Sequence, residues 1–136
     1  MGKFTQGELD DINKTISTPV ECLTWAFDNL HPKLAKASSF GAEDAAIIDL
    51  MFKINSDARL FTLETGRLPQ ATFDVMDEVQ KRYNTKIEML YPDEQEVEKM
   101  VKEKGLDCFY DSIENRKLCC GIRKVCLLYT SDAADE

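Results

Sequence analysis

After Pro32 the sequence alternates between short apolar segments that are typical of buried strands and longer segments with helical spacing. Strands that are separated by helices pair in parallel, through right-handed crossovers. The sequence therefore predicts an α/β fold with a three-layer parallel sheet. The expected elements are a strand at residues 33–38, a helix at 42–53, a strand at 59–63, a helix from 69 to about 83, a strand at 86–91 and a helix at 93–104.

Capping signals mark several helix ends. Thr5 followed by Glu8 is a capping box, and the segment Thr-Pro-Val-Glu at 18–21 starts a second helix that should end before Pro32. Gly105 should close the helix at 93–104. Helical spacing assigns inward faces to Leu23, Ala26, Phe27 and Leu30, to Ala46, Ile47, Leu50 and Ile54, and to Phe73, Met76, Val79 and Tyr83.

Charge and hydropathy exclude several classes of function. The net charge of −8 argues against a nucleic-acid-binding protein. The longest aliphatic run, residues 45–48, is far shorter than the ~20 residues of a membrane span, and the polar, acidic N-terminus does not look like a secretory signal. Five cysteines in such a chain favour reduced thiols over a disulfide scaffold. We therefore expect a cytoplasmic protein without membrane or nucleic-acid partners.

The first predicted strand leads into a loop suited to binding phosphate. Ligands of open α/β sheets bind at the carboxyl ends of strands, where backbone N–H groups gather at a helix N-terminus. Here Gly41 should permit close backbone approach and adopt a positive φ. The alternative is a loop that simply caps a helix. The candidate substrate-binding residues are Ser38, Ser39, Phe40, Gly41, Glu43 and Asp44.

A second loop of similar composition follows the next strand, at the same predicted edge of the sheet. Its candidate binding residues are Glu64, Thr65, Gly66 and Arg67. Arg67 could pair with a phosphate or stack on a base. It could equally be a surface arginine near a helix start.

Adjacent cysteines, Cys119 and Cys120, precede Arg123 and Lys124. Neighbouring cysteines do not form an unstrained mutual disulfide, but both can ligate a multi-iron cluster, and nearby cations lower the pKa of thiols. Without further ligands, the pairing could also be coincidental. By contrast, Cys22 and Cys108 lie in apolar patterns and are expected to be buried fillers.

The last eleven residues, 126–136, fit no preceding element. They look like one reading frame of a common sequencing-library adapter. We therefore expect residues 1–125 to be the N-terminal portion of a single domain and residues 126–136 to be a non-native tail. A genuine, disordered acidic tail is the alternative.

Three segments together resemble one family, the adenylyl-sulfate and phosphoadenylyl-sulfate reductases of assimilatory sulfate reduction. The family's phosphate loop is similar to Ser-Ser-Phe-Gly-Ala-Glu-Asp at 38–44. Its second motif resembles Leu-Asp-Thr-Gly-Arg-Leu-Pro, here 63–69 with Glu64 in place of Asp, and its cysteine motif resembles Cys-Cys-x-x-Arg-Lys-Val at 119–125. The resemblance covers about residues 35–125, in order.

The resemblance implies a Rossmann-like sheet of the adenine-nucleotide α-hydrolase type, incomplete at its C-terminus. It implies reduction of adenosine 5′-phosphosulfate to sulfite and AMP, by thioredoxin- or glutaredoxin-type thiols. Cys119 and Cys120 would be two of four ligands of a [4Fe–4S] cluster, and the catalytic Arg123 and Lys124 would stabilise charge. The family's later Cys-x-x-Cys and its nucleophilic Glu-Cys-Gly are absent from this sequence. A fragment without the nucleophile should be inactive alone. The resemblance is compatible with a homo-oligomer.

Three alternative functions are compatible with parts of this pattern. The first is a reductase of 3′-phosphoadenylyl sulfate, a branch of the family that usually lacks the cysteine pair. The second is an ATP-cleaving relative such as the small subunit of sulfate adenylyltransferase, whose loop usually reads Ser-Gly-Gly-x-Asp-Ser, so that Phe40 and Glu43 depart from it. The third is a nucleotide-binding module without catalytic activity.

Overall fold

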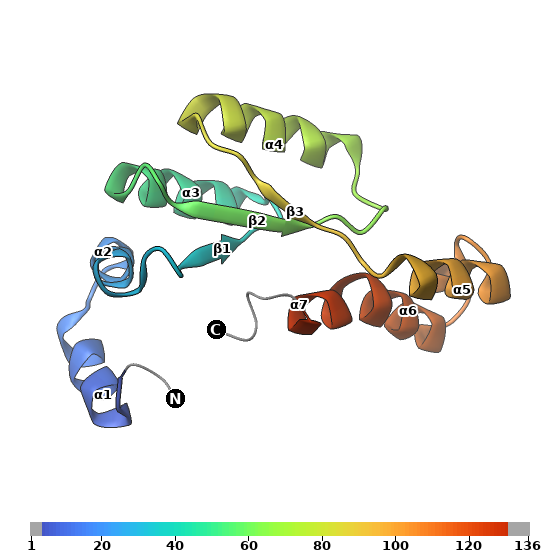
Figure 1. Cartoon of the computed structure of the whole chain (residues 1–136), viewed down its shortest axis with the longest axis horizontal. Coiled ribbons are helices and arrows are strands. Elements are labelled where there is room, and N and C mark those ends of the chain that lie inside the picture. Colours follow the sequence, from blue (N-terminus) through green and yellow to red (C-terminus); the bar gives the residue numbers. More distant parts are fainter. Residues whose placement is uncertain (1–3, 131–136) are drawn as a thin grey trace.

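The computed structural model describes residues 4–130. It contains a three-stranded parallel sheet in the order β1-β2-β3 and a series of helices around it (Figure 1). The elements in chain order are α1 (Gln6–Thr15), α2 (Pro19–Leu30), β1 (Ala35–Ala37), α3 (Ala42–Ile54), β2 (Arg59–Leu63), α4 (Gln70–Tyr83), β3 (Glu88–Leu90), α5 (Glu94–Lys104), the 3₁₀ helix η1 (Cys108–Tyr110), α6 (Ile113–Cys120), the π-helix η2 (Gly121–Val125) and α7 (Cys126–Thr130).

The central strand β2 pairs with both neighbours in parallel. Ala35 is in register with Arg59 across β1 and β2, and Phe61 with Glu88 across β2 and β3. The predicted α/β class and parallel sheet are confirmed, although β1 and β3 are each three residues long and thus shorter than expected. The chain returns through α3 and α4 between the strands, as alternating strand and helix segments require.

The predicted caps are present. The Thr5 hydroxyl accepts from the backbone N–H of Glu8, and the Thr18 hydroxyl from that of Glu21, each with the reciprocal bond of a capping box. Gly105 ends α5 with a φ of +92°, a conformation that glycine adopts without strain. Local sequence therefore determines where these helices begin and end.

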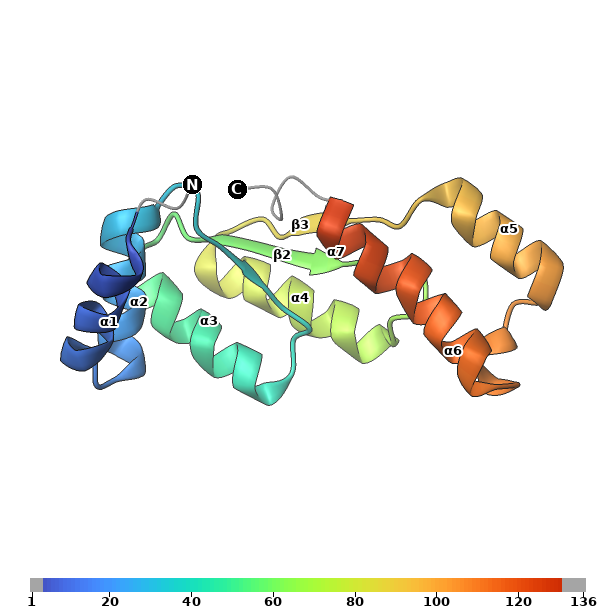
Figure 2. The same cartoon turned by 90° about the horizontal axis from the view of Figure 1, so that it is seen from below.

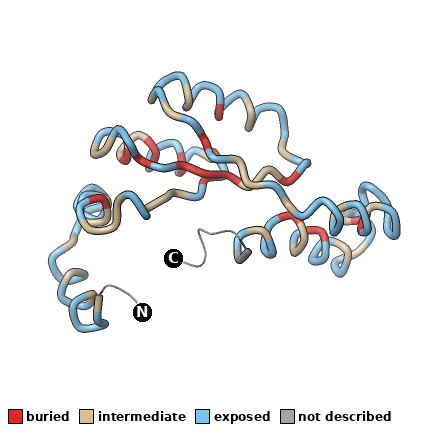
Figure 3. The backbone as a smooth tube through the Cα atoms, in the orientation of Figure 1, coloured by how far each residue is buried: buried red, intermediate tan, exposed pale blue. Residues whose placement is uncertain are grey.

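Helices α3 and α4 cover one face of the sheet with an apolar core. Figure 3 shows its buried residues concentrated along β2 and on the sheet-facing sides of the helices. The cluster comprises Phe40, Ile48, Leu60, Met76, Val79 and Ile87, and partly buried Phe73 and Tyr83 pack against it. The expected inward face of α4 is therefore confirmed.

The predicted inward face of α3 is wrong, because the helix is rotated about its axis relative to the prediction and buries a different set of residues. Its buried residues are Asp44, Ile48 and Met51, whereas Ile47 is exposed. The aliphatic run in α3 leaves helical periodicity ambiguous. The rotation follows from Asp44, which is hydrogen-bonded into the preceding loop and so directs the positions four and seven residues later toward the sheet.

The segment from α5 to α7, residues 94–130, forms an arm on the side of the sheet opposite to α3 and α4 (Figures 1 and 2). It has its own small core of Met100, Cys108 and Cys119. The residues from 126 were expected to fit no element, but Cys126–Thr130 continue the preceding helix as α7. Residues 131–136 of the predicted tail lie outside the described part of the chain.

Candidate functional site

A cavity of about 390 Å³ lies at the carboxyl ends of β1 and β2. This is where ligands settle on open α/β sheets. Of the residues predicted from the sequence, it is lined by Ser38, Ser39, Glu43, Asp44, Thr65 and Lys124. The other lining residues are Ala37, Phe61, Thr62, Leu63, Leu68 and Thr72. The fold thus brings together residues that are more than eighty positions apart.

The first loop, between β1 and α3, is organised around the carboxylate of Asp44. Its Oδ2 accepts from the backbone N–H of Ser39 at 2.7 Å and from that of Phe40 at 3.1 Å. Its Oδ1 lies 2.5 Å from the Nζ of Lys36 on β1. Two amides that the sequence suggested for phosphate are therefore already paired with a side chain of the same loop.

These partners keep Asp44 ionised. Burial would raise the pKa of this carboxyl, but hydrogen bonds from Lys36 and Ser39 and the positive charge of Lys36 outweigh it and hold the pKa at about 2. Asp44 therefore carries its negative charge at neutral pH, in contact with Lys36 and facing the cavity.

The left-handed residue of this loop is Phe40, with a φ of +62°, and not Gly41, whose φ is −70°. The predicted positive φ of Gly41 is thus wrong, because the Phe40 side chain must turn into the core, where it is 8% exposed. Gly41 is the N-cap of α3, and no described side chain caps that helix. The first-turn N–H groups of α3 are consequently the donors that the loop offers to an anion.

The second loop, after β2, turns at Gly66, which has a φ of +72°. The Gly66 N–H donates to the carboxylate of Glu64 at 2.5 Å, and the Arg67 N–H donates to the hydroxyl of Thr65 at 3.2 Å. Thr65 is 4% exposed and lines the cavity. Glu64 and Gly66 thus shape the turn that presents Thr65.

Arg67 does not line the cavity. Its guanidinium donates to the carbonyl of Leu106 at 3.0 Å and to the carboxylate of Asp107, and it lies 4.8 Å from the centre of the Phe109 ring. The side chain predicted to meet a nucleotide therefore contacts the start of η1, forty residues further along the chain.

Arg123 and Lys124 reach the same region from the arm. Arg123 is 7% exposed, and its Nη1 donates to the carbonyl oxygen of Thr65 at 2.5 Å. Its buried Nε has no hydrogen-bond partner among the described residues. A buried guanidinium with an unpaired donor is costly, so this position favours an anionic group nearby. The neighbouring Lys124 is exposed and lines the cavity.

The two adjacent cysteines have different surroundings. Cys119 is 8% exposed and packs with Met100 and Cys108, whereas Cys120, the last residue of α6, is exposed. Cys108 is buried as expected, but Cys22 is exposed, so its predicted burial is wrong: α2 turns only Phe27 fully inward. The described cysteines are all free thiols.

The adjacent pair consists of one thiol in the arm core, Cys119, and one exposed thiol, Cys120. Cys119 and Cys120 offer two thiols, and the cationic Arg123 and Lys124 follow within five residues. Within residues 4–130 no group of three or more His, Cys, Asp or Glu side chains could hold a metal ion.

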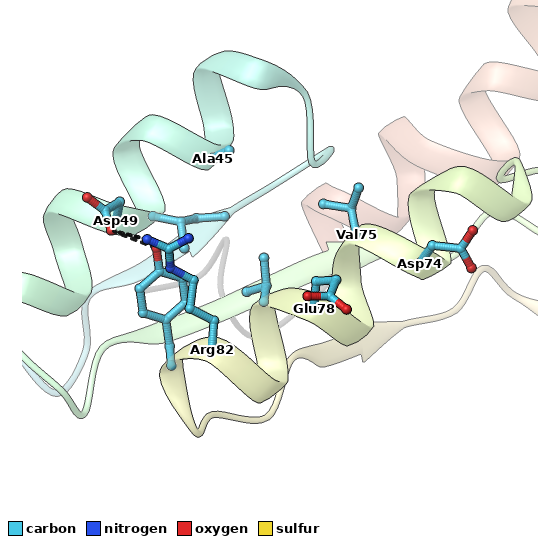
Figure 4. A pocket seen from close by; sticks show the side chains of 9 residues that line it. Ala45, Asp49, Asp74, Val75, Glu78 and Arg82 are labelled. Atoms are coloured by element: carbon cyan, nitrogen blue, oxygen red, sulfur yellow. Dashed lines mark hydrogen bonds and ion pairs between the residues drawn. The ribbon is translucent and has the colours of Figure 1, made fainter.

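A second cavity, also about 390 Å³, lies between α3 and α4. Figure 4 shows Asp49 and Arg82 facing each other across it. The Asp49 carboxylate lies 3.8 Å from the Arg82 guanidinium and accepts from the Tyr83 hydroxyl at 2.8 Å. Hydrogen bonds from Lys53 and then Tyr83 lower the pKa of Asp49. The cavity is also lined by the carboxylates of Asp74 and Glu78, and none of the predicted site residues lies here.

Sequence reasoning missed Lys36 as part of the site. Its side chain is 17% exposed and pairs with Asp44. A lysine in the middle of a strand that is otherwise expected to be buried was the available signal, because buried charges require a partner. Asp107 and Phe109 were missed as partners of Arg67, and no local sequence signal connects them.

Comparison with known proteins agrees with this geometry. The sequence model of the phosphoadenosine phosphosulfate reductase domain matches residues 33–131. Adenosine 5′-phosphosulfate reductase of Pseudomonas aeruginosa (strain LESB58) is 39% identical over 108 residues, which cover 79% of this chain and 39% of that protein. Chloroplastic 5′-adenylylsulfate reductase 3 of Arabidopsis thaliana is 38% identical over 109 residues, covering 80% of this chain and 23% of that protein.

The fold is also similar to a solved structure. The crystal structure of phosphoadenylyl-sulfate reductase from Candida auris, in a phosphate complex, superimposes with a TM-score of 0.72 at 25% identity, covering 93% of this chain and 61% of that chain. This chain thus spans well under half the length of the two sequence relatives. Because the family match includes both loops, the cysteine pair and the arm, the chain belongs to the phosphoadenosine phosphosulfate reductase family.

Proposed function

We propose that this chain forms the nucleotide-binding part of a reductase that converts adenosine 5′-phosphosulfate to sulfite and AMP. The observation that carries the proposal is the cavity at the carboxyl end of the sheet, where Ser38, Ser39, Thr65 and Lys124 converge beside the uncapped first turn of α3. Hydroxyl groups, helix-terminal amides and a lysine are the donors that phosphate and sulfate oxygens accept. The proposal is supported by the names of the bacterial and plant relatives.

The cationic residues of the arm complete this site. Lys124 can meet the negative charge of the phosphosulfate at the cavity wall. Arg123 is buried and its Nε has no partner among the described residues, so its guanidinium would stabilise further negative charge of a ligand bound in the cavity. Placing fixed positive charge where negative charge develops is the contribution that such residues make to group transfer.

We further propose that Cys119 and Cys120 hold two positions of a [4Fe–4S] cluster in the complete enzyme. Such a cluster, when bound, would supply a concentrated charge at the end of α6. Cys119 would supply its thiol from the arm core and Cys120 from the exposed end of α6. Arg123 and Lys124, which follow the pair within five residues, would offset the negative charge of the thiolates.

The remaining chemistry is assigned to protein outside this chain. A thiolate nucleophile would attack the sulfate sulfur and displace AMP, which leaves an enzyme S-sulfonate. A thioredoxin- or glutaredoxin-type dithiol would then attack the sulfonated sulfur of that enzyme thiol, release sulfite and be oxidised to a disulfide. The five free cysteines fit a reducing compartment such as the cytoplasm. Among the described residues, no helix has the length and apolar character needed to cross a membrane.

Calorimetric titration of the chain with AMP and with adenosine tests the proposed site. AMP should bind more tightly than adenosine, and Lys124→Gln should remove most of that difference. Lys117→Gln is the matched control, since Lys117 is an exposed lysine on α6 that does not line the cavity. Equal affinity for AMP and adenosine would remove the cavity from consideration as a phosphosulfate site.

A preference for the 3′-phosphorylated substrate is the second candidate, because the similar structure from Candida auris is a phosphoadenylyl-sulfate reductase. Titration with adenosine 3′,5′-bisphosphate distinguishes a preference for the 3′-phosphorylated substrate from a preference for adenosine 5′-phosphosulfate. Tighter binding of the bisphosphate than of AMP would favour that substrate. Similar affinity for both would favour adenosine 5′-phosphosulfate.

A further inference from the structure

The arm and the sheet have separate apolar cores. The arm core contains Met100, Cys108 and Cys119, while the clusters around the sheet lie mainly in α2, α3, α4 and the strands. Among the described residues, the arm cluster shares no member with either of the clusters around the sheet. The placement of the arm therefore does not follow from a common core. It depends on the chain connection after β3 and on the polar contacts between the two parts.

Two arginines make these contacts, in opposite directions. Arg67 extends from the second loop to the arm, where it bonds the carbonyl of Leu106 and the carboxylate of Asp107 and lies over Phe109. Arg123 extends from the arm to the second loop, where it bonds the carbonyl of Thr65.

Both contacts act on one short turn. The backbone N–H of Arg67 donates to the hydroxyl of Thr65, so that the residue held by Arg123 is tied directly to the residue that holds the arm. Lys124 follows Arg123 in η2 and lines the cavity. The position of the arm thus decides where the Lys124 ammonium lies relative to Ser38 and Ser39.

We propose that Arg67 is a positioning residue, which through Asp107 and Phe109 holds the arm against the second loop and so places Lys124 at the cavity. This inference rests on the proposed function, because it assigns the effect of Arg67 on nucleotide binding to the arm. It differs from the expectation that the guanidinium of Arg67 meets the nucleotide itself.

The two roles predict different results for the partner of Arg67. We would measure the affinity for AMP of Arg67→Ala, Asp107→Ala and the double variant by calorimetry. If Arg67 positions the arm, Arg67→Ala should weaken binding about fivefold, the scale of one half-exposed ion pair with a cation–π contact. Asp107→Ala should weaken it by a smaller factor, because the contacts of Arg67 with Leu106 and Phe109 remain. The double variant should weaken binding no further than Arg67→Ala alone, because the contact that Asp107→Ala removes is already lost in Arg67→Ala.

If Arg67 binds the nucleotide directly, Asp107→Ala frees the guanidinium and leaves the affinity unchanged or higher, and the proposal is overturned. Arg67→Lys should retain part of the wild-type affinity, since a lysine can still pair with Asp107 but cannot also reach Leu106 and stack on Phe109. Arg116→Ala is the matched control, because Arg116 is an exposed arginine on α6.

Hydrogen–deuterium exchange tests the contact without a ligand. Arg67→Ala and Asp107→Ala should both speed exchange in residues 64–68 and in residues 121–125, whereas Arg116→Ala should change neither. Faster exchange in only one of the two segments would overturn the proposed coupling. If the wild-type chain does not bind AMP but the two variants speed exchange in both segments, the proposed function is contradicted, whereas the proposed contact between Arg67 and the arm is supported.

Discussion

The Nζ of Lys36 lies 2.5 Å from the Oδ1 of Asp44, and this pair joins β1 to the first turn of α3 behind the cavity. Both side chains are largely buried, at 17% and 12% exposed. Asp44 also bonds the amides of Ser39 and Phe40, so the loop carries an anion of its own. An incoming phosphate therefore meets the free first-turn amides of α3 and the Lys124 side chain.

Asp44→Asn should destabilise the chain above pH 4 and abolish part of its acid sensitivity. The pKa of Asp44 is about 2 in the folded chain and 3.8 ordinarily, so the ionised carboxylate stabilises the fold above pH 3.8. That contribution is lost as the pH falls from 3.8 through about 2. The loss at neutral pH should be roughly 1–2 kcal/mol.

Urea unfolding from pH 2 to pH 7 measures this effect. Asp28→Asn, which neutralises an exposed aspartate on α2, is the control and should leave the pH profile unchanged. If the wild type and Asp44→Asn lost stability in parallel between pH 4 and pH 2, the Lys36–Asp44 pair would not be the source of acid sensitivity.

Alanine substitutions at Gly66 and Gly41 should affect the free energy of unfolding to different extents. Gly66→Ala places a side chain at a φ of +72° and a Cβ 3.1 Å from the Nη1 of Arg123, and should cost about 1–2 kcal/mol. Gly41→Ala adopts an ordinary φ of −70°, and the atoms nearest to its Cβ, at 2.9–3.2 Å, belong to the Glu43 carboxylate, the end of a flexible side chain that can turn away. It should change the unfolding free energy by less than about 0.5 kcal/mol.

Ligand binding should distinguish the same two sites. A larger side chain, Gly41→Val, obstructs the approach of an anion to the start of α3 and should weaken AMP binding in a chain that remains folded. Thermal unfolding and AMP titration of all three variants provide the measurements. Unchanged AMP affinity in Gly41→Val would remove the first loop from the site.

The cysteines should divide into two reactivity classes. Brief alkylation of the native chain followed by peptide mass spectrometry should label the exposed Cys22, Cys120 and Cys126 first. The buried Cys108 and Cys119 should react only after unfolding. Equal labelling of Cys119 and Cys120 would contradict the placement of Cys119 in the arm core.

Shortening the chain tests whether residues 126–130 contribute to the fold. The sequence pattern predicts that removing residues 126–136 leaves the thermal midpoint within about 2 °C. In the structure the Cys126 N–H donates to the carbonyl of Gly121 and closes the turn that carries Arg123. We therefore expect the thermal midpoint of a chain ending at Val125 to lie roughly 4 °C below that of the full chain. A chain ending at Thr130 should have the same thermal midpoint as the full chain.

Much of the architecture is encoded locally and could be predicted. The capping boxes at Thr5 and Thr18 and the glycine at 105 define helix ends because a few neighbouring residues satisfy the terminal backbone groups. The two loops could be placed at one edge because parallel strands share a direction. These inferences require no knowledge of tertiary contacts.

The remainder depends on contacts between distant residues. The rotation of α3 follows from Asp44 and not from apolar spacing. The role of Arg67 depends on Asp107, forty positions away, and therefore cannot be predicted from the residues adjacent to Arg67 in the sequence. The helices of residues 113–125 were not predicted, because apolar and charged residues alternate in this segment with little amphipathic periodicity.

The π-helical turn of residues 121–125 has a consequence for how this segment can vary. A π turn accommodates one residue more than a regular helical turn, so deleting a single residue there would restore an ordinary α-helix. Everything after the deletion would then rotate by about 100° around the helix axis. Arg123 and Lys124 could no longer reach the second loop and the cavity together, although the composition of the arm would hardly change. The length of this turn is therefore as much a determinant of the site as the identity of its residues.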